Sequence, residues 1–320
     1  MLFLQISVFF ISLFVLIKSA DIFVQGSSSI AKRFKISQIV IGLTLVSIGT
    51  SLPEMVVNIF ASISVNYEIV FGNVIGSNIT NILLILGISG LINPIVVKRN
   101  TTYKEIPFSF LSTLILFILV NDKIVNGNNF ENVLSRSEGM ILLIMFFGFM
   151  YYVIKIAKVE PSIEENIKIL SLKKSIIFII FGLIFLFVSA RFTVQSAVYI
   201  ARFFKVSEAL ISLTIISVGT SLPELITSSV ASYRKNSDIA IGNIIGSNIF
   251  NILFILGISS LIRNAYYKTI FNFDILILFY STFLLFSLMF LGKRHILGKK
   301  GSFSMLVSYL IYLIIIILRK

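Results

Sequence analysis

The hexapeptide GTSLPE stands at residues 49–54 and returns unchanged at residues 219–224. Each copy places a carboxylate and two hydroxyl groups beside a proline, inside a long apolar run. The offset of 170 residues between the copies also relates GNVIGSN at 72–78 to GNIIGSN at 242–248. We interpret these four segments as one cation site that is built from two related halves.

The composition excludes a soluble globular protein. Of the 320 residues, 57% are hydrophobic and 13% are charged, and the mean hydropathy is +1.01; so few polar residues do not cover a water-exposed surface. With no cysteine and one histidine, His295, disulfides, thiolate sites and histidine-rich metal sites are excluded. The net charge of +13 is interpreted as basic loops of a membrane protein and not as nucleic-acid binding.

Ten apolar runs along the chain approach or exceed the length of a membrane-spanning helix, which is about 20 residues. The runs are continuously apolar, without the alternation that is typical of strands in a membrane barrel. The first run lacks a basic leader and a cleavage site, so we expect it to be retained. We therefore predict an all-α integral membrane protein with ten transmembrane helices, at about 2–23, 36–63, 68–93, 106–120, 139–154, 175–193, 207–232, 238–262, 273–291 and 303–318.

The repeat divides the chain into residues 1–160, with helices 1–5, and residues 161–320, with helices 6–10. Because five is an odd number, the second half enters the membrane from the opposite side, which predicts two inverted-topology five-helix repeats. The signature segments of the two repeats are 47–58, 72–89, 217–228 and 242–259.

Lysine and arginine in the loops predict the orientation of the chain. Alternate loops, beginning with the loop after the first helix, hold 17 basic residues, whereas the opposite side holds nine. Because basic loops favour the cytoplasmic side, we expect both termini to lie outside.

Glu54 and Glu224 fall in the middle of apolar runs, where a carboxylate costs roughly 2.5–3.5 kcal/mol on insertion scales. One alternative is an ion pair with Lys18 or Arg191, but these two do not match in the repeat and both can reach an interface. A mobile cation is the better partner. Pro53 and Pro223 each lack an amide hydrogen, so they either free carbonyl oxygens toward that cation or simply kink the helix for packing.

Helices 3 and 8 present a second polar wall. Asn73, Ser77 and Asn81 share one helix face, because they are spaced by four residues, and the second repeat has the same stripe. Hydrogen bonding between helices is the alternative role for these side chains. The glycines of both GxxxG segments are interpreted as packing positions. The stripe of the second repeat is Asn243, Ser247 and Asn251.

All of these groups offer hard oxygen atoms, which favour Na⁺, Ca²⁺ or Mg²⁺ over zinc or copper. Two bidentate glutamates with the carbonyls of Thr50 and Thr220 give about six oxygens, and Ca²⁺ takes about 6–8. Magnesium requires a stricter octahedron. No organic cofactor is expected, and the ions are the cargo.

The paired motifs resemble the repeats of the calcium/cation antiporter superfamily, and within it they are most similar to prokaryotic sodium/calcium exchangers. The resemblance covers nearly the whole chain. It implies exchange of Na⁺ for Ca²⁺ at the plasma membrane by alternating access, with helices 1 and 6 sliding across a rigid core. It also implies, as ion ligands, Glu54, Glu224, Thr50, Thr220, Ser51, Ser221, Ser77, Ser247, Asn81 and Asn251, with the carbonyls of Ser47 and Ser217.

The chain departs from the family at Asn251, where some members carry Asp, and it has no room for a large cytoplasmic regulatory domain. Proton/calcium exchange on the same fold is the main alternative; its members usually show a glutamate on helices 3 and 8, where this chain has asparagine. A membrane enzyme lacks a visible nucleophile or base cluster. A passive channel is usually built from several subunits. Membrane lipid is an expected partner, and the oligomeric state is left open.

Overall fold

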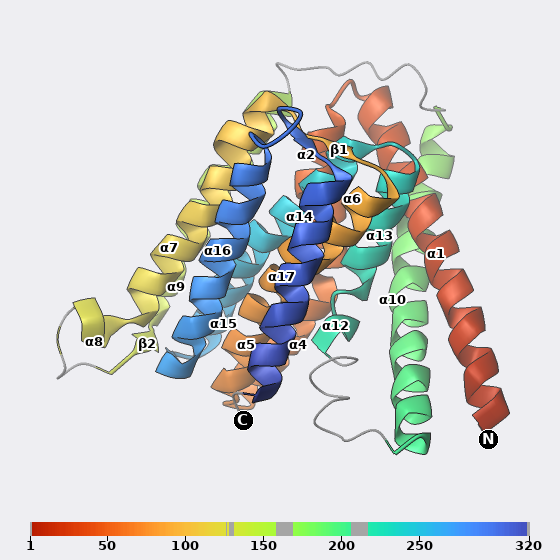
Figure 1. Ribbon diagram of the computed structural model, residues 1–320. Coiled ribbons are helices and arrows are strands. Elements are labelled where there is room, and N and C mark those ends of the chain that lie inside the picture. Colours follow the sequence, from red (N-terminus) through yellow and green to blue (C-terminus); the bar gives the residue numbers. More distant parts are fainter. Residues whose placement is uncertain (1, 126, 128–130, 158–168, 206–216, 319–320) are drawn as a thin grey trace.

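This computed structural model describes residues 2–125, 127, 131–157, 169–205 and 217–318. The chain is mostly helical, as the sequence predicts (Figure 1). The first half contains α1 (Leu2–Arg33), α2 (Gln38–Ile41), η1 (Gly42–Val46), α3 (Ser47–Thr50), α4 (Leu52–Ile63), α5 (Tyr67–Ile79), η2 (Thr80–Ile85), α6 (Leu86–Ile92), η3 (Thr101–Glu105), α7 (Ile106–Val120), α8 (Asp122–Val125) and α9 (Arg136–Ala157).

The second half follows the same order of elements. It contains α10 (Leu172–Phe203), α12 (Ser217–Gly219), α13 (Leu222–Tyr233), α14 (Ser237–Ile249), η5 (Phe250–Ile255), α15 (Leu256–Ile262), η6 (Thr269–Phe271), α16 (Asn272–Leu288) and α17 (Lys299–Leu318). The segments η1, η2, η3 and η5 are π-helical turns inside longer helices.

Eight helices in the described part of the chain are long and apolar enough to cross a membrane, and a ninth crossing results if the bent helix from Gln38 to Ile63 is counted once. This confirms a multi-helix membrane protein. The remaining predicted run, 207–232, is represented by α12 and α13, and residues 206–216 lie outside the described part. The chain ends near residues 2 and 318 lie at the same end of the bundle (Figure 1).

Helices α1 and α10 are longer than the apolar runs 2–23 and 175–193 that predicted them. The extra turns contain polar residues that are satisfied inside the helix pair: Ser175 Oγ donates to Ser29 Oγ at 2.9 Å. The two helices lie side by side, apart from the main bundle (Figure 1), and α1 contacts the rest chiefly through α13. Hydropathy underestimates such helices because it counts buried polar groups as breaks.

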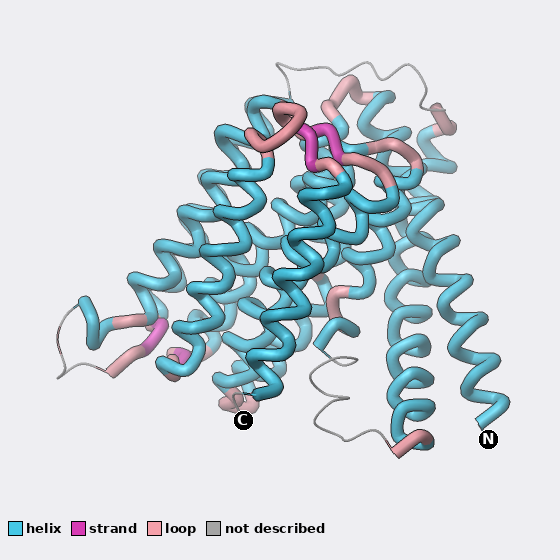
Figure 2. Tube along the Cα trace, in the orientation of Figure 1, coloured by secondary structure: helices cyan, strands magenta, loops and turns pink. Residues whose placement is uncertain are grey.

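Two short sheets at opposite ends of the molecule were not expected from the sequence. Strand β1 (Ile95–Val96) pairs with β4 (Ile296–Leu297), and β2 (Val133–Leu134) pairs with β3 (Ala265–Tyr266). Figure 2 shows one magenta pair at the top and the other at the bottom. Strands of two residues are too short to show any periodicity in the sequence. Each sheet ties a loop of the first half to a loop of the second.

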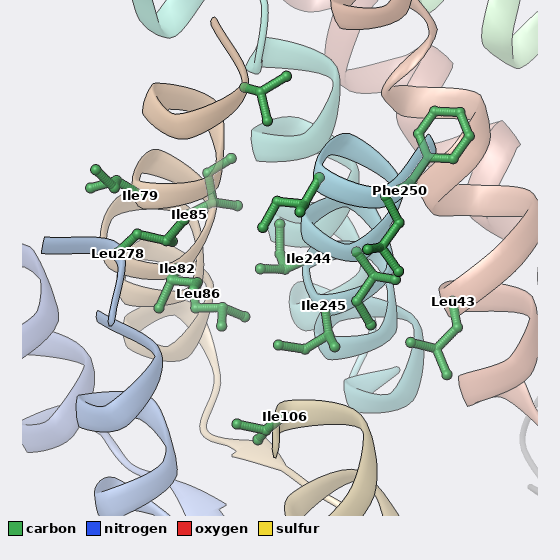
Figure 3. Packing of buried hydrophobic residues seen from close by; sticks show 14 of the residues in the cluster. Leu43, Ile79, Ile82, Ile85, Leu86, Ile106, Ile244, Ile245, Phe250 and Leu278 are labelled. Carbon is green, nitrogen blue, oxygen red and sulfur yellow. The ribbon is translucent and has the colours of Figure 1, made fainter. Parts of the chain in front are cut away.

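The core is centred on the helix that runs through α14, η5 and α15, nearly all of which is buried. Figure 3 shows Ile244 and Ile245 of α14 between Leu43 of η1 and Ile82 of η2. Close packing depends on glycine here: a Cβ atom added at Gly242 would lie 3.0 Å from the Cα atom of Gly42. The GxxxG segment of α14 is therefore a packing surface, as predicted.

Candidate cation site

Both copies of the GTSLPE hexapeptide break a helix at the same residue. Ser51 (φ −85°, ψ 8°) separates α3 from α4, and Ser221 (φ −89°, ψ 9°) separates α12 from α13. Each proline follows in the first turn of the new helix, where its missing amide hydrogen costs little. The first break bends the chain by 47°. It places Glu54 at the start of α4, and the second break places Glu224 at the start of α13.

The two glutamates are the buried charged groups of the site, each only 1% exposed. Their hydrogen bonds cross between the halves. Ser51 Oγ donates to Glu224 Oε1 at 2.8 Å, and Ser221 Oγ donates to Glu54 Oε1 at 3.3 Å. The Oε2 atom of each glutamate is buried and has no hydrogen-bond partner among the described residues.

The alternative of a structural ion pair is not supported in the described part of the chain. Lys18 is exposed, with its Nζ 5.7 Å from the ring centre of Phe14, and Arg191 is exposed as well. The described salt bridges join Lys98 to Asp238, Arg234 to Asp21, and Lys268 to Glu68. None of them reaches Glu54 or Glu224, so each carboxylate has an oxygen available for a cation.

Asn81 and Asn251 add a second pair of buried oxygens. Both residues lie in π-helical turns, η2 and η5, and both are 1% exposed. Their Oδ1 atoms have no hydrogen-bond partner among the described residues. A buried acceptor without a partner costs about 1–3 kcal/mol, and π-helical turns are frequent at functional sites. Together with the Oε2 atoms of Glu54 and Glu224, these Oδ1 atoms form two repeat-related pairs of buried oxygens, whose cost a bound cation would offset.

Four further predicted ligands, Ser47, Thr50, Ser77 and Ser247, make contacts across the same interface. Ser221 Oγ is 3.3 Å from Ser77 Oγ, and Ser247 Oγ donates to the carbonyl of Ser47 at 3.4 Å. Thr50 Oγ1 is 3.0 Å from Asn243 Oδ1. The Ser47 carbonyl also accepts from the amide of Ser51 at 3.1 Å, so the proline break does not leave it without a partner.

Two asparagines of the predicted polar stripe, Asn73 and Asn243, donate hydrogen bonds within their own repeat. Asn73 of the stripe donates to Asn58 Oδ1 at 2.6 Å and to the carbonyl of Glu54 at 3.3 Å, so it braces α4 against α5. Asn243 donates to Ser228 Oγ at 2.9 Å in the same way. The hydrogen-bonding alternative thus describes these two asparagines. The side chain of Ser217 lies outside the described part.

Asn78 and Asn248 were quoted in the repeated motif but were not predicted to act in the site. Asn78 Nδ2 donates to the carbonyl of Asn248 at 3.1 Å, and Asn248 Nδ2 donates to the carbonyl of Asn78 at 3.2 Å. Their Oδ1 atoms accept from Asn251 Nδ2 at 2.9 Å and from Asn81 Nδ2 at 3.0 Å, respectively. Their repetition at the same offset is the only sequence signal that pointed to them.

The two halves of the site differ in exposure. Gly72, Asn73 and Gly76 of α5 are partly exposed, whereas the three equivalent residues of α14 are buried. Thr220 is likewise partly exposed, and its counterpart Thr50 is fully buried. The α14 residues pack against η1, and the repeat equivalent of η1, residues 212–216, lies outside the described part.

The described donors of the site are all oxygen atoms. Within the described residues, no three Asp, Glu, His or Cys side chains lie close enough together to hold a metal ion. Two carboxylates combined with neutral amide and hydroxyl oxygens suit a hard cation that is bound and released.

The family model described as sodium/calcium exchanger protein matches residues 4–155 and 174–318. The sodium/calcium exchanger MaX1 of Methanosarcina acetivorans is 30% identical over 285 residues, which cover 78% of this chain and 81% of the relative. The inner membrane protein YrbG of Escherichia coli is 35% identical over 262 residues, which cover 79% and 78%. A solved structure of the sodium-calcium exchanger NCX_Mj, soaked with Na⁺ and Ca²⁺, has a TM-score of 0.80 at 33% identity and covers 97% of this chain and 98% of its own.

Proposed function

This chain belongs to the sodium/calcium exchanger family and is a transporter rather than an enzyme; on that premise we propose that it exchanges Na⁺ for Ca²⁺ across the plasma membrane by alternating access. The buried pair Glu54 and Glu224 carries the proposal, because each has an Oε2 atom without a partner among the described residues. When both are ionised their charge is −2, which one Ca²⁺ neutralises. Pairing with a cation is how a membrane protein offsets the cost of such charges.

The proposed ligands are the oxygens of the twelve residues that the resemblance implies. Support is strongest for the carboxylates and for the amide oxygens of Asn81 and Asn251, because these four groups hold unpaired buried acceptors. The hydroxyls of Ser51 and Ser221 donate hydrogen bonds to the carboxylates of Glu224 and Glu54. The others in the proposed set are Ser47, Thr50, Ser77, Ser217, Thr220 and Ser247.

Coupling follows if the two ions use the same oxygens. Na⁺ and Ca²⁺ are close in size and both prefer hard oxygen ligands, so occupation by one excludes the other. Exclusive occupation is the condition for exchange rather than leak. If the Na⁺ charge moved per cycle exceeds the Ca²⁺ charge, each net charge is worth about 2.3 kcal/mol per 100 mV.

We assign the chain ten spans in two inverted repeats, residues 1–160 and 161–320. The hydrogen bonds between the two halves support this assignment, because each bond from the first half to the second has a repeat-equivalent bond from the second half to the first. The sheets support it too: β1 and β3 are equivalent at the 170-residue offset, yet they lie at opposite ends of the molecule (Figure 2). Equivalent elements at opposite ends are what an inverted repeat produces.

Flux into proteoliposomes tests the function. Purified protein is reconstituted with internal Na⁺, diluted into Na⁺-free buffer with labelled Ca²⁺, and compared with vesicles that carry a K⁺ or a proton gradient. We expect Ca²⁺ uptake with the Na⁺ gradient alone, and a membrane potential should change its rate.

Each arm has a distinct meaning. Uptake that is driven by a pH gradient without Na⁺ would replace the proposal with proton/calcium exchange on the same fold. Dissipation of a Ca²⁺ gradient without any counter-ion would indicate a channel. Absence of Na⁺-dependent Ca²⁺ movement in protein that remains folded would sink the proposal.

A further inference from the structure

The asparagine network at the centre of the molecule has a direction that is fixed by the main chain. The carbonyl oxygen of Asn248 is an acceptor only, so the group that meets it must be a donor. Asn78 turns its Nδ2 toward that carbonyl, at 3.1 Å. The Oδ1 atom of Asn78 then points to Asn251, which must present its own Nδ2, at 2.9 Å. The Oδ1 atom of Asn251 is thereby directed away from the network.

The repeat-related hydrogen bonds fix the orientation of Asn248 and Asn81 in the same way. The carbonyl of Asn78 accepts from Asn248 Nδ2, and Asn248 Oδ1 accepts from Asn81 Nδ2 at 3.0 Å. Both carbonyls lie just before a π-helical turn, where the helical hydrogen-bond ladder changes register. All four side chains are at most 1% exposed, so water does not substitute for the missing partners.

An isolated asparagine can present either end of its amide to a cation. Its oxygen attracts the ion and its NH₂ group repels it, so a free amide is a poor ligand until its orientation is fixed. In this chain the orientation is fixed before any ion binds, because each amide nitrogen is already engaged. The result is the pair of buried and unpartnered Oδ1 atoms on Asn81 and Asn251.

We propose that Asn78 and Asn248 are positioning residues, which hold the amide oxygens of Asn251 and Asn81 toward the transported cation. This inference rests on the proposed function and deepens it. Each positioning residue acts on the ligand of the opposite repeat, so the network also binds the two halves of the site together. It also makes an amide the fitting group at position 251, because a carboxylate there would face Asn78 Oδ1 with two acceptors opposed.

A double-mutant cycle in Ca²⁺ binding tests this role. Titration calorimetry on the purified full chain measures the Kd of Ca²⁺ for Asn78→Leu, Asn251→Ala and the double variant. We expect each single change to raise the Kd about tenfold, which is about 1.4 kcal/mol. The double variant should bind no more weakly than Asn251→Ala alone, since Asn78 acts through Asn251.

The crossed arrangement supplies an internal comparison. In the double variant Asn78→Leu with Asn81→Ala, the Kd of Ca²⁺ should rise about a hundredfold, which is the product of the two single effects. The reason is that Asn248, and not Asn78, holds Asn81. The mirror cycle with Asn248→Leu and Asn81→Ala is independent, and it keeps the test decisive if Asn78→Leu does not fold. Thr80→Val is the matched control, since Thr80 lies in the same π-helical turn as Asn81. The change removes a buried hydroxyl that hydrogen-bonds the hydroxyl of Tyr309 at 3.3 Å, and the Kd of Ca²⁺ should not change.

Multiplicative effects for Asn78→Leu with Asn251→Ala, or a Kd unchanged by Asn78→Leu, would overturn the positioning role. Failure of the proposed function is detected in the flux assay: proton-driven or uncoupled Ca²⁺ movement would replace Na⁺/Ca²⁺ exchange and leave these Ca²⁺-binding cycles interpretable. If the wild-type protein binds no Ca²⁺, the same cycles are measured with Na⁺, from the shift in Tm on adding NaCl against choline chloride, and the same pattern of coupling decides the role.

Discussion

The hydroxyl of Ser51 donates to the carboxylate of Glu224 across the centre of the molecule, at 2.8 Å, although 173 residues separate them in the chain. The equivalent contact from Ser221 to Glu54 is longer, at 3.3 Å. Each hexapeptide therefore provides a carboxylate for its own half and a hydroxyl for the carboxylate of the other half. The serine hydrogen bond of each carboxylate thus comes from the opposite repeat.

Replacing either carboxylate by its amide should abolish exchange. Glu54→Gln and Glu224→Gln keep the size of the side chain but remove a charge and replace the free oxygen with a nitrogen donor. We expect Na⁺-driven Ca²⁺ uptake to fall more than a hundredfold in each case. Glu68→Gln is the control, since Glu68 pairs with Lys268 at an exposed position and its loss should leave uptake unchanged. Normal transport by Glu54→Gln would show that the carboxylate is not a ligand.

Ser51→Ala should weaken Ca²⁺ binding through Glu224. A hydrogen bond to a charged group contributes about 1.5–3 kcal/mol, so the KM for Ca²⁺ should rise about tenfold or more. The effect should be clearly smaller in a Glu224→Gln background and keep its full size in a Glu54→Gln background when Ca²⁺ binding is measured directly. Ser64→Ala removes an exposed hydroxyl that bonds its own helix, at 2.8 Å from the carbonyl of Phe60, and should have no effect. Equal effects in both backgrounds would contradict the pairing.

Gly246 of α14 and Gly148 of α9 should respond differently to alanine. A Cβ atom at Gly246 would lie 2.8 Å from Ser47 Cβ and 2.9 Å from Leu43 Cα, whereas Gly148 is exposed and no described atom lies within 4 Å of a Cβ atom there. Overpacking costs about 1–3 kcal/mol, and alanine stabilises a helix by about 1 kcal/mol over glycine. We therefore expect Gly246→Ala to lower the Tm in detergent and Gly148→Ala to maintain or raise it. A similar loss of Tm in both variants would refute the difference in packing.

The ion pair between Asp21 of α1 and Arg234 at the end of α13 should control how firmly α1 is held. Both side chains are partly exposed, at 27% and 39%, so removing the pair should cost no more than about 1 kcal/mol of stability. Because α1 contacts the bundle chiefly through α13, Asp21→Asn should broaden the distance distribution between spin labels at Phe14 and Tyr233. The double charge reversal Asp21→Arg with Arg234→Asp restores an ion pair, so the distance distribution should become narrow again. No broadening in Asp21→Asn would mean that packing alone holds α1.

Cysteine labelling of intact cells tests the orientation, and the chain offers a background without any cysteine. Ser64 follows the end of α4 and Tyr233 is the last residue of α13; both are exposed, and the basic residues assign these two helix ends to opposite sides of the membrane. An impermeant thiol reagent should label Ser64→Cys and leave Tyr233→Cys unlabelled until the cells are permeabilised. The reverse pattern would place both termini in the cytoplasm.

Several features could be predicted from short stretches of the sequence. The lengths of the apolar runs gave the helical membrane class, which is confirmed, and Pro53 and Pro223 marked the two helix breaks. The resemblance to sodium/calcium exchangers, carried by the repeated motifs, is confirmed by the family match. The exact number of spans and the inverted arrangement stay proposals, since residues 206–216 lie outside the described part. The ends of α1 and α10 were predicted too short, because their polar serines are buried against each other.

The sequence by itself determined that this protein lies in a membrane, that it consists of two related halves, and that two carboxylates sit where only a compensated charge is tolerated. These are properties of local composition and spacing, and hydrophobicity and proline geometry act within a few turns of helix. Only the tertiary structure decided which hydroxyl donates to which carboxylate, and that Asn78 and Asn248 accept hydrogen bonds from Asn251 and Asn81. Those relationships join side chains about 170 residues apart, and their directions depend on how two folded halves face each other.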